Sequence, residues 1–166
     1  MAKTVFNIAL AVSVIILGIV AYIFLPALVT PPEDRIPFSI IDRGVRSDWV
    51  EQANFRIDTE KDFQNLWEAI HGNATSIPQV DFDREFIIVA FLGVREKEGY
   101  GITVAEVRKT SAGYTIVLKE ETPGDGCINT PAALTPYVIA RVPRRDVSGP
   151  VPLESTVISV RTSCTL

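Results

Sequence analysis

The sequence has few of the residues on which most catalytic and metal sites depend. Its 166 residues include one histidine, His71, and two cysteines, Cys127 and Cys164. A single histidine excludes histidine-rich metal sites and disfavours a serine-type triad. The chain also lacks a Gly-x-Ser-x-Gly elbow, a His-Glu-x-x-His pair and a glycine-rich phosphate loop ahead of a helix. We therefore expect no catalytic residue, no bound metal and no cofactor.

A basic cluster is also missing, and the formal net charge is −4. Nucleic-acid binding normally requires a basic patch that faces the phosphates, so we expect no nucleic-acid partner. Carboxylates gather at Asp81, Asp83 and Glu85, and with the distant Asp125 they could in principle bind Ca²⁺. The alternation of apolar and acidic residues from Val80 to Asp83 is more typical of a strand entrance with one solvated face. We predict no calcium site there.

Charge is absent from a long apolar run, Val5 to Val29. A helix of this length reaches about 37 Å, enough to cross a hydrocarbon core of about 30 Å. The run predicts a single transmembrane helix at residues 5–29, in contact with the lipid bilayer. A cleaved signal peptide is the alternative. Its apolar core is usually about 7–15 residues and ends at small residues, whereas bulky Leu25 stands where the site before Leu28 needs a small one.

The residues that flank the apolar run predict the orientation of the chain. Lys3 and the amino terminus place positive charge on the short side, so residues 1–4 are expected in the cytoplasm. Residues 30–37 have the composition of a stiff, proline-rich tether. Residues 38–166 are then a folded domain outside the cell membrane, in the periplasm or on the cell surface.

Cys127 and Cys164 fit that location, because an even number of cysteines in an oxidising compartment usually forms disulfides. A bond between them would close a loop of about 38 residues and stabilise the fold by about 4 kcal/mol in chain-entropy estimates. Reduced structural cysteines are one alternative. A nucleophilic thiol paired with His71 is another, although no local motif supports it.

The clearest helix signal lies at residues 58–72. Asp58 or Thr59 can cap the amino end, and Gly72 fits the C-terminal stop. Apolar residues at helical spacing form one face that we expect to pack on a sheet: Phe63, Leu66, Trp67 and Ile70.

A continuous apolar run, Phe86-Ile-Ile-Val-Ala-Phe-Leu-Gly93, suits a central strand that is buried on both faces. A turn-rich loop is expected at residues 122–131. Further strands are expected at residues 37–44, 53–57, 102–108, 114–119, 137–143 and 155–162. The predicted fold class is α+β: a mainly antiparallel β-sheet domain with one principal helix, preceded by a single N-terminal transmembrane helix.

The connection that follows the central strand combines charge with glycine. Gly99 and Gly101 let the chain turn and approach its neighbours without a Cβ clash, and Tyr100 between them can set its ring on the sheet. Four charged residues precede them, and such a group is often a self-compensating, solvated turn. We predict a structural corner that also serves as a contact loop together with residues 121–131. The candidate binding residues are Arg95, Glu96, Lys97, Glu98, Gly99, Tyr100 and Asp125.

Residues 80–107, VDFDREFIIVAFLGVREKEGYGITVAEV, resemble the C-terminal domain of PrcB, an accessory subunit of a protease complex. In that family a Val-Asp-Phe entrance leads to an apolar strand ending in Leu-Gly, and an Arg-containing turn and a Gly-Tyr pair follow. The helix upstream and residues 121–143 downstream are similar as well, so the resemblance covers roughly residues 52–143. The family turn commonly reads Arg-Pro-(Ser/Thr)-Gly-Gly-Tyr, whereas Glu96, Lys97 and Glu98 stand here.

The resemblance implies a non-catalytic, exported domain that associates with a protease complex and stabilises it. We expect an interaction domain whose partner is an envelope or secreted protein, with a protease among the candidates. Three alternatives stay open. One is a peptidase inhibitor of the chagasin type, which inserts β-sandwich loops into a protease cleft. Another is an envelope module that binds a small molecule or glycan, for which the region of Trp49 is the first place to look. The third is an enzyme with an unrecognised site.

Overall fold

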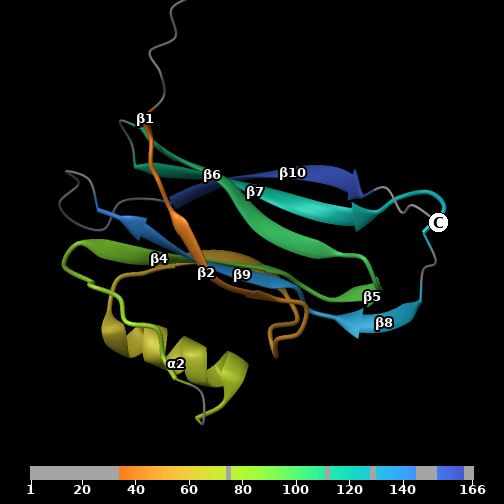
Figure 1. Cartoon of the computed structure of the whole chain (residues 1–166), viewed down its shortest axis with the longest axis horizontal. Helices are drawn as coiled ribbons and strands as arrows, with labels where there is room; N and C mark the ends of the chain where they lie inside the picture. The colour runs from red at the N-terminus through yellow and green to blue at the C-terminus, as the bar shows by residue number, and fades with distance from the viewer. Residues whose placement is uncertain (1–33, 74–75, 111–112, 128–129, 145–152, 163–166) are drawn as a thin grey trace, which may run out of the picture. The chain divides into compact units, whose positions relative to one another are not determined.

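Two four-stranded β-sheets pack face to face, and one helix covers the outer face of the second sheet (Figure 1). The computed structural model describes residues 34–73, 76–110, 113–127, 130–144 and 153–162. Sheet A has the strand order β1-β6-β7-β10, and sheet B has the order β2-β9-β4-β3. A third, two-stranded sheet joins β5 to β8.

The elements are β1 (Asp34–Arg35), β2 (Ser39–Gly44), β3 (Gln52–Ile57), α2 (Glu60–His71), β4 (Glu85–Leu92), β5 (Arg95–Lys97), β6 (Gly101–Lys109), β7 (Tyr114–Pro123), β8 (Pro131–Leu134), β9 (Tyr137–Pro143) and β10 (Leu153–Thr162).

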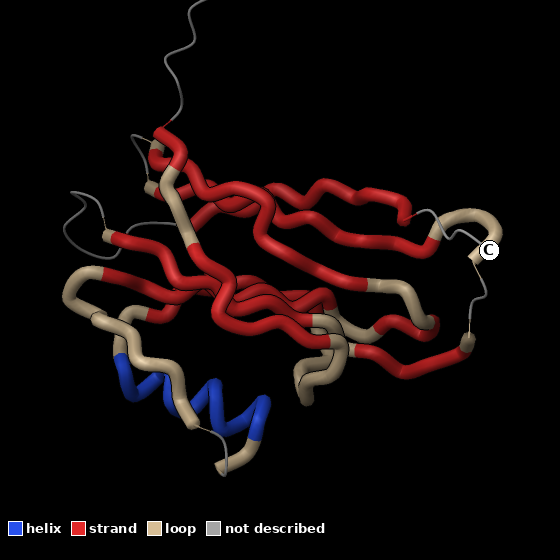
Figure 2. The backbone as a smooth tube through the Cα atoms, viewed as in Figure 1, coloured by secondary structure: helices blue, strands red, loops and turns tan. Residues whose placement is uncertain are grey.

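Helix α2 begins and ends where its caps predict. The Thr59 side chain accepts a hydrogen bond from the Asp62 N–H at 3.2 Å, which satisfies one of the free donors of the first turn. Gly72 ends the helix with a φ of 74°, and its N–H donates to the Glu68 carbonyl at 2.7 Å. The helix lies beside sheet B (Figure 2), and its apolar side chains belong to the same buried cluster as those of β4 and β9. The predicted helix and its packing face are confirmed.

Strand β4 is buried on both faces, as its continuous apolar run predicts. Because side chains alternate along a strand, every second residue from Phe86 to Leu92 faces the core between the sheets. The residues between them, Ile87, Val89 and Phe91, face α2. Burial of each large apolar side chain contributes about 1.5–3 kcal/mol relative to exposure. Strand β4 therefore holds the two apolar clusters of the domain together.

The predicted fold class needs correction. In the part of the chain that the structure describes, α2 is the single helix, and no helix has both the length and the apolar character needed to span a bilayer. This finding corrects the expectation of a transmembrane helix ahead of the β-rich domain. The segment predicted to form that helix, residues 5–29, lies outside the described residues. Sheet A is also mixed, because β10 pairs with β7 in parallel, whereas the strand pairs of sheet B are antiparallel.

The folded unit begins earlier than predicted. Residues 30–37 were expected to form a tether, but Asp34 and Arg35 pair with Lys109 and Arg108 of β6. The next residue, Ile36, is only 3% exposed, and its N–H donates to the Val107 carbonyl at 2.8 Å. The compact unit therefore spans Asp34–Leu166 rather than starting at residue 38.

Candidate functional site

The charged connection at residues 94–101, called the tip below, is a corner between the two sheets and not a hairpin. It leaves β4 of sheet B and enters β6 of sheet A. Its first residues form β5, whose Arg95 and Lys97 pair with Leu134 and Pro131 of β8. The Glu98 N–H donates to the Thr130 carbonyl at 3.0 Å. The predicted corner is confirmed, and Figure 1 shows β5 and β8 side by side at one end of the domain.

Glycine is required where the tip approaches the end of β7. Gly99 has a φ of 90°, a region that residues with a side chain rarely adopt. A Cβ on Gly99 would lie 3.1 Å from Pro123 Cβ, so the two loops expected to make contacts meet at this point. A Cβ on Gly101 would lie 3.2 Å from a carboxylate oxygen of Glu121, the flexible end of a side chain. The predicted use of glycine in the corner is confirmed at Gly99.

Arg95 and Tyr100 connect the tip to the sandwich. The Arg95 guanidinium lies 3.2 Å from Glu120 Oε1 on β7 and 5.7 Å from the centre of the Tyr100 ring. Tyr100 is half-buried against the core between the sheets. The sequence suggested a turn whose charges compensate one another. In the structure, Arg95 instead pairs with a residue of another strand.

A cavity of about 560 Å³ opens beside the tip. Its walls come from the end of β2 and the residues after it, from the tip, and from β7 and β8. Both signs of charge line it, two arginines and two glutamates. The lining residues are Arg43, Gly44, Val45, Arg46, Glu98, Gly99, Tyr100, Gly101, Ile102, Glu121 and Leu134.

The structure places the predicted binding residues in three groups. Glu98, Gly99 and Tyr100 line the cavity. Glu96 and Lys97 are exposed on β5, beside the ion-paired Arg95. The side chain of Asp125 is 95% exposed and does not line the cavity, since it pairs with Arg161 of β10 at 3.0 Å.

Reasoning from the sequence missed the two cavity arginines, Arg43 and Arg46. Both are exposed, and neither forms an ion pair with another residue in the described ranges. The signal in the sequence was the Arg-Gly-Val-Arg segment at the end of a predicted strand. A guanidinium group can bind a carboxylate through two parallel N–H···O hydrogen bonds.

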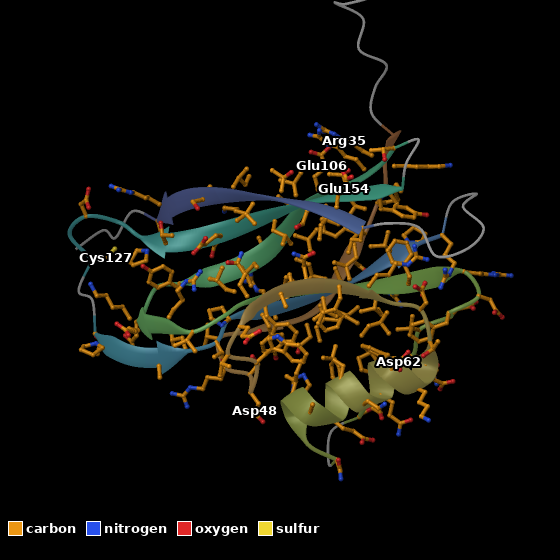
Figure 3. The ribbon with its side chains drawn as sticks, turned by 180° about the vertical axis from the view of Figure 1, so that it is seen from behind. Arg35, Asp48, Asp62, Glu106, Cys127 and Glu154 are labelled. Carbon is orange, nitrogen blue, oxygen red and sulfur yellow. The ribbon has the colours of Figure 1, made fainter. Side chains whose placement is uncertain are left out.

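Cys127 lies in the loop after β7 and is disulfide-bonded. Its expected partner, Cys164, lies outside the described residues, so the pairing itself stays a prediction. The loop is close to the end of β10, because the Gly124 N–H donates to the Thr162 carbonyl at 3.1 Å. Figure 3 shows Cys127 beside the C-terminal end of that strand. A disulfide-bonded Cys127 is not available as a nucleophilic thiol.

The single histidine, His71, is the last residue of α2, the helix that packs on the outer face of sheet B. His71 Nε2 is 2.7 Å from Asp42 Oδ2, and the Tyr137 hydroxyl donates to the same oxygen at 2.8 Å. Burial, followed by the hydrogen bond to Asp42, raises the pKa of Tyr137 well above its ordinary value. This cluster joins the helix end to β2 and β9.

Trp49 was predicted as the first place to look for a small-molecule or glycan site. The residue is 43% exposed, and its ring stacks on Phe91 with ring centres 4.9 Å apart and planes 13° apart. An apolar groove of about 410 Å³ runs from Trp49 between β3 and α2. One face of the Trp49 ring therefore packs against Phe91, and the residue remains partly exposed.

The acidic residues considered for Ca²⁺ are engaged in a turn. Asp81 Oδ1 accepts from the Asp83 N–H at 3.1 Å, and Asp81 Oδ2 lies 3.7 Å from Arg84. Within the described ranges, no group of three or more His, Cys, Asp or Glu residues is placed to hold a metal ion.

The segment that contains the tip and the ends of β7, β8 and β9 also carries the family signal. Residues 86–143 match the PrcB C-terminal family. The resemblance seen in the sequence is confirmed over this segment, while residues 52–85 lie ahead of it. The PrcB C-terminal match runs from β4 to β9 and includes most of the cavity wall, but not Arg43 and Arg46. No curated protein and no solved structure matches the chain.

Proposed function

We propose that the folded unit is a non-catalytic accessory domain that binds another protein in a protease complex, using the surface around the cavity at the tip. The observation that carries this proposal is the PrcB C-terminal match. It spans the tip and the loop after β7, and these two segments lie against each other in the fold.

The surface has the properties that recognition of a protein requires. It is held in place by the β5–β8 pairing and by the Arg95–Glu120 ion pair, so little order is lost on binding. Two exposed apolar residues stand next to charged ones in the chain, since Val45 precedes Arg46 and Val94 precedes Arg95. Arg43 and Arg46 offer guanidinium groups to a carboxylate of the partner, which would add specificity and a faster association rate.

The proposed place of action is outside the cytoplasm. Disulfides persist in oxidising compartments and are rare in the cytosol. Cys127 is disulfide-bonded, which supports this location. The proposed partner is accordingly an envelope or secreted protease.

The test is affinity purification of the full chain from its own cells, with recovered proteins quantified by mass spectrometry. We expect a protease to be recovered with the wild type. Its recovery should fall about tenfold or more in the double variant Arg43→Glu/Arg46→Glu and in Tyr100→Ala. A loss of about 1.4 kcal/mol of binding free energy lowers the affinity tenfold, and single hot-spot residues often contribute more than that.

Arg84→Glu is the matched control, since Arg84 is exposed at the opposite end of β4 from the tip. This variant should recover as much protease as the wild type. Equal recovery with all variants would reject the tip as the contact surface, and no protease with the wild type would reject the accessory role.

A second candidate function is peptidase inhibition. It is favoured by one observation: the tip and the loop after β7 lie side by side at one end of a β-sandwich, the arrangement that chagasin-type inhibitors insert into a protease cleft. Titration of the purified chain against a panel of peptidases separates the two functions. An inhibitor lowers turnover in proportion to its concentration, whereas an accessory domain leaves turnover unchanged or prolongs the activity of its partner.

A further inference from the structure

Among the described strands, β10 forms an open edge of sheet A. It pairs with β7 over its whole length, Leu153–Thr162, without a register shift, and no described strand pairs with its other side. Edge strands in soluble proteins are usually short, bulged, or protected by lysine or proline. The segment Ser155–Val160 has none of these features. It exposes apolar side chains instead, with Val157, Ile158 and Val160 exposed by 39%, 43% and 40%.

The backbone of β10 offers a regular row of hydrogen-bonding groups at this edge. The carbonyls of Thr162 and Val160 point toward β7, since they accept from the Gly124 N–H and the Thr122 hydroxyl. Backbone groups of successive strand residues point to opposite sides. The odd-numbered residues from Ser155 to Arg161 therefore direct their N–H and C=O groups away from β7. Another extended chain is the protein element that can pair with the whole row at once.

Contacts near both ends hold β10 in place. Near its beginning, Asn54 Nδ2 donates to Ser155 Oγ at 3.0 Å, which ties β10 to β3 of the other sheet. At its end, Arg161 pairs with Asp125 at 3.0 Å beside the disulfide-bonded loop. An edge strand that is already ordered loses little entropy when a further strand joins it.

We propose that this edge binds the β10 of a second copy of the chain in antiparallel orientation, so that sheet A continues across the two molecules. In a two-fold symmetric antiparallel pair, one residue faces its own counterpart. The structure assigns this position to Ile158. The outer-face pairs are then Ile158 with Ile158 and Thr156 with Val160, all β-branched residues that pack well across strands.

Charge selects this register over the neighbouring one. With Ile158 on the axis, Arg161 faces Ser155 and Glu154 faces Thr162, so each charged residue meets a polar one. With Val157 on the axis, Arg161 would face Leu153 and Glu154 would face Val160, which places both charges against apolar side chains. Both registers set the outward-pointing odd residues opposite one another, and in the Ile158 register these pairs are Ser155 with Arg161 and Val157 with Ser159. Each such pair exchanges two backbone hydrogen bonds.

A second copy is favoured over a strand of a different protein because β10 matches its own reverse. Its centre is uncharged, Glu154 lies near its beginning and Arg161 near its end. No like charges therefore meet in the symmetric pair. This inference concerns the edge of sheet A and is independent of the contact surface proposed at the tip.

The test measures the mass of the purified full chain, kept in solution by a non-ionic detergent, by sedimentation equilibrium with the detergent density-matched. We expect the wild type to sediment as two chains. Ile158→Lys and Ile158→Glu should each sediment as one chain, because like charges would meet on the axis. An equimolar mixture of the two variants should return to two chains, since the lysine introduced in one chain then faces the glutamate introduced in the other.

Three controls keep the result specific to β10. Val50→Lys changes another exposed apolar residue and should leave the mass of two chains unchanged. Ser159→Pro removes only an outward-facing N–H and should give single chains, whereas Ser159→Ala should not. Circular dichroism melting of every variant should show an intact fold, as expected for exposed positions.

A wild type that sediments as one chain at high concentration would overturn the proposal and leave the edge for a strand of another protein. Association that survives Ile158→Lys, or a mixture of the lysine and glutamate variants that stays as single chains, would overturn it as well.

Discussion

The Tyr137 hydroxyl donates a hydrogen bond to Asp42 Oδ2 at 2.8 Å, joining β9 to the edge strand β2. His71 at the end of α2 lies 2.7 Å from the same oxygen. One carboxylate thus connects two strands and the helix, although Asp42 and Tyr137 are far apart in the sequence. The edge strand β2 contains Arg43 and is followed closely by Arg46, so this contact also positions one wall of the proposed binding surface.

Tyr137→Phe should lower the free energy of unfolding by about 1.5–3 kcal/mol, because it removes a hydrogen bond to a charged group. Urea unfolding followed by fluorescence measures the change. Tyr114→Phe is the matched control: Tyr114 is also buried, but no described residue bonds its hydroxyl, so its loss should cost far less. Equal effects of the two substitutions would show that the Asp42 contact does not stabilise the fold.

The raised pKa of Tyr137 predicts a loss of stability in alkali. The ordinary tyrosine pKa of the unfolded chain is about 10, and burial raises the pKa in the folded state. The folded state therefore keeps a proton that the unfolded state loses, so stability is complete below about pH 10 and falls as the pH rises further. Unfolding of the wild type and Tyr137→Phe at a series of pH values should show their stability difference shrinking above about pH 10. A constant difference would contradict the assignment.

Gly44→Ala should destabilise the domain because the added Cβ would lie 2.6 Å from Cε1 of the buried Tyr137 ring. Overpacking of this kind usually costs about 1–3 kcal/mol. Gly101→Ala is the control, since its Cβ would meet only the mobile end of Glu121 at 3.2 Å. Thermal melting of both variants gives the comparison. A Gly44→Ala variant as stable as Gly101→Ala would mean that Tyr137 can move aside at little cost.

Reduction of the disulfide at Cys127 should destabilise the domain, by as much as about 4 kcal/mol if the closed loop is about 38 residues long. Urea unfolding with and without a reductant measures this effect. Cys127→Ser should match the reduced wild type and show no response to the reductant. If the urea midpoint of the wild type is the same with and without the reductant, the disulfide no longer supports a location outside the cytoplasm.

Local signals account for the elements that could be predicted. Thr59 and Gly72 can cap a helix wherever it lies, and the spacing of Phe63, Leu66 and Trp67 defines one apolar face regardless of what covers it. Strand β4 has no polar residue in its apolar run, so its burial on both faces follows from composition. The glycines of the tip likewise predicted a corner.

Long-range pairing decided what could not be predicted. Strands β1, β5 and β8 are short and form only because a partner lies beside them. Strand β1 pairs with β6, and β5 pairs with β8. The parallel pairing of β10 with β7 depends on the path of the whole chain. Arg43 and Arg46 reach the cavity because β2 pairs with β9 and ends beside the tip.

The sequence by itself determined the β-rich core, the capped helix, the corner at residues 94–101 and the likeness to the PrcB C-terminal family. Each of these depends on residues close together in the chain, where spacing and composition act directly. Only the tertiary structure decided which loops meet, which charges line the cavity and which strand is left at an open edge. Those outcomes depend on sheet order and register, which are set by contacts between residues far apart in sequence.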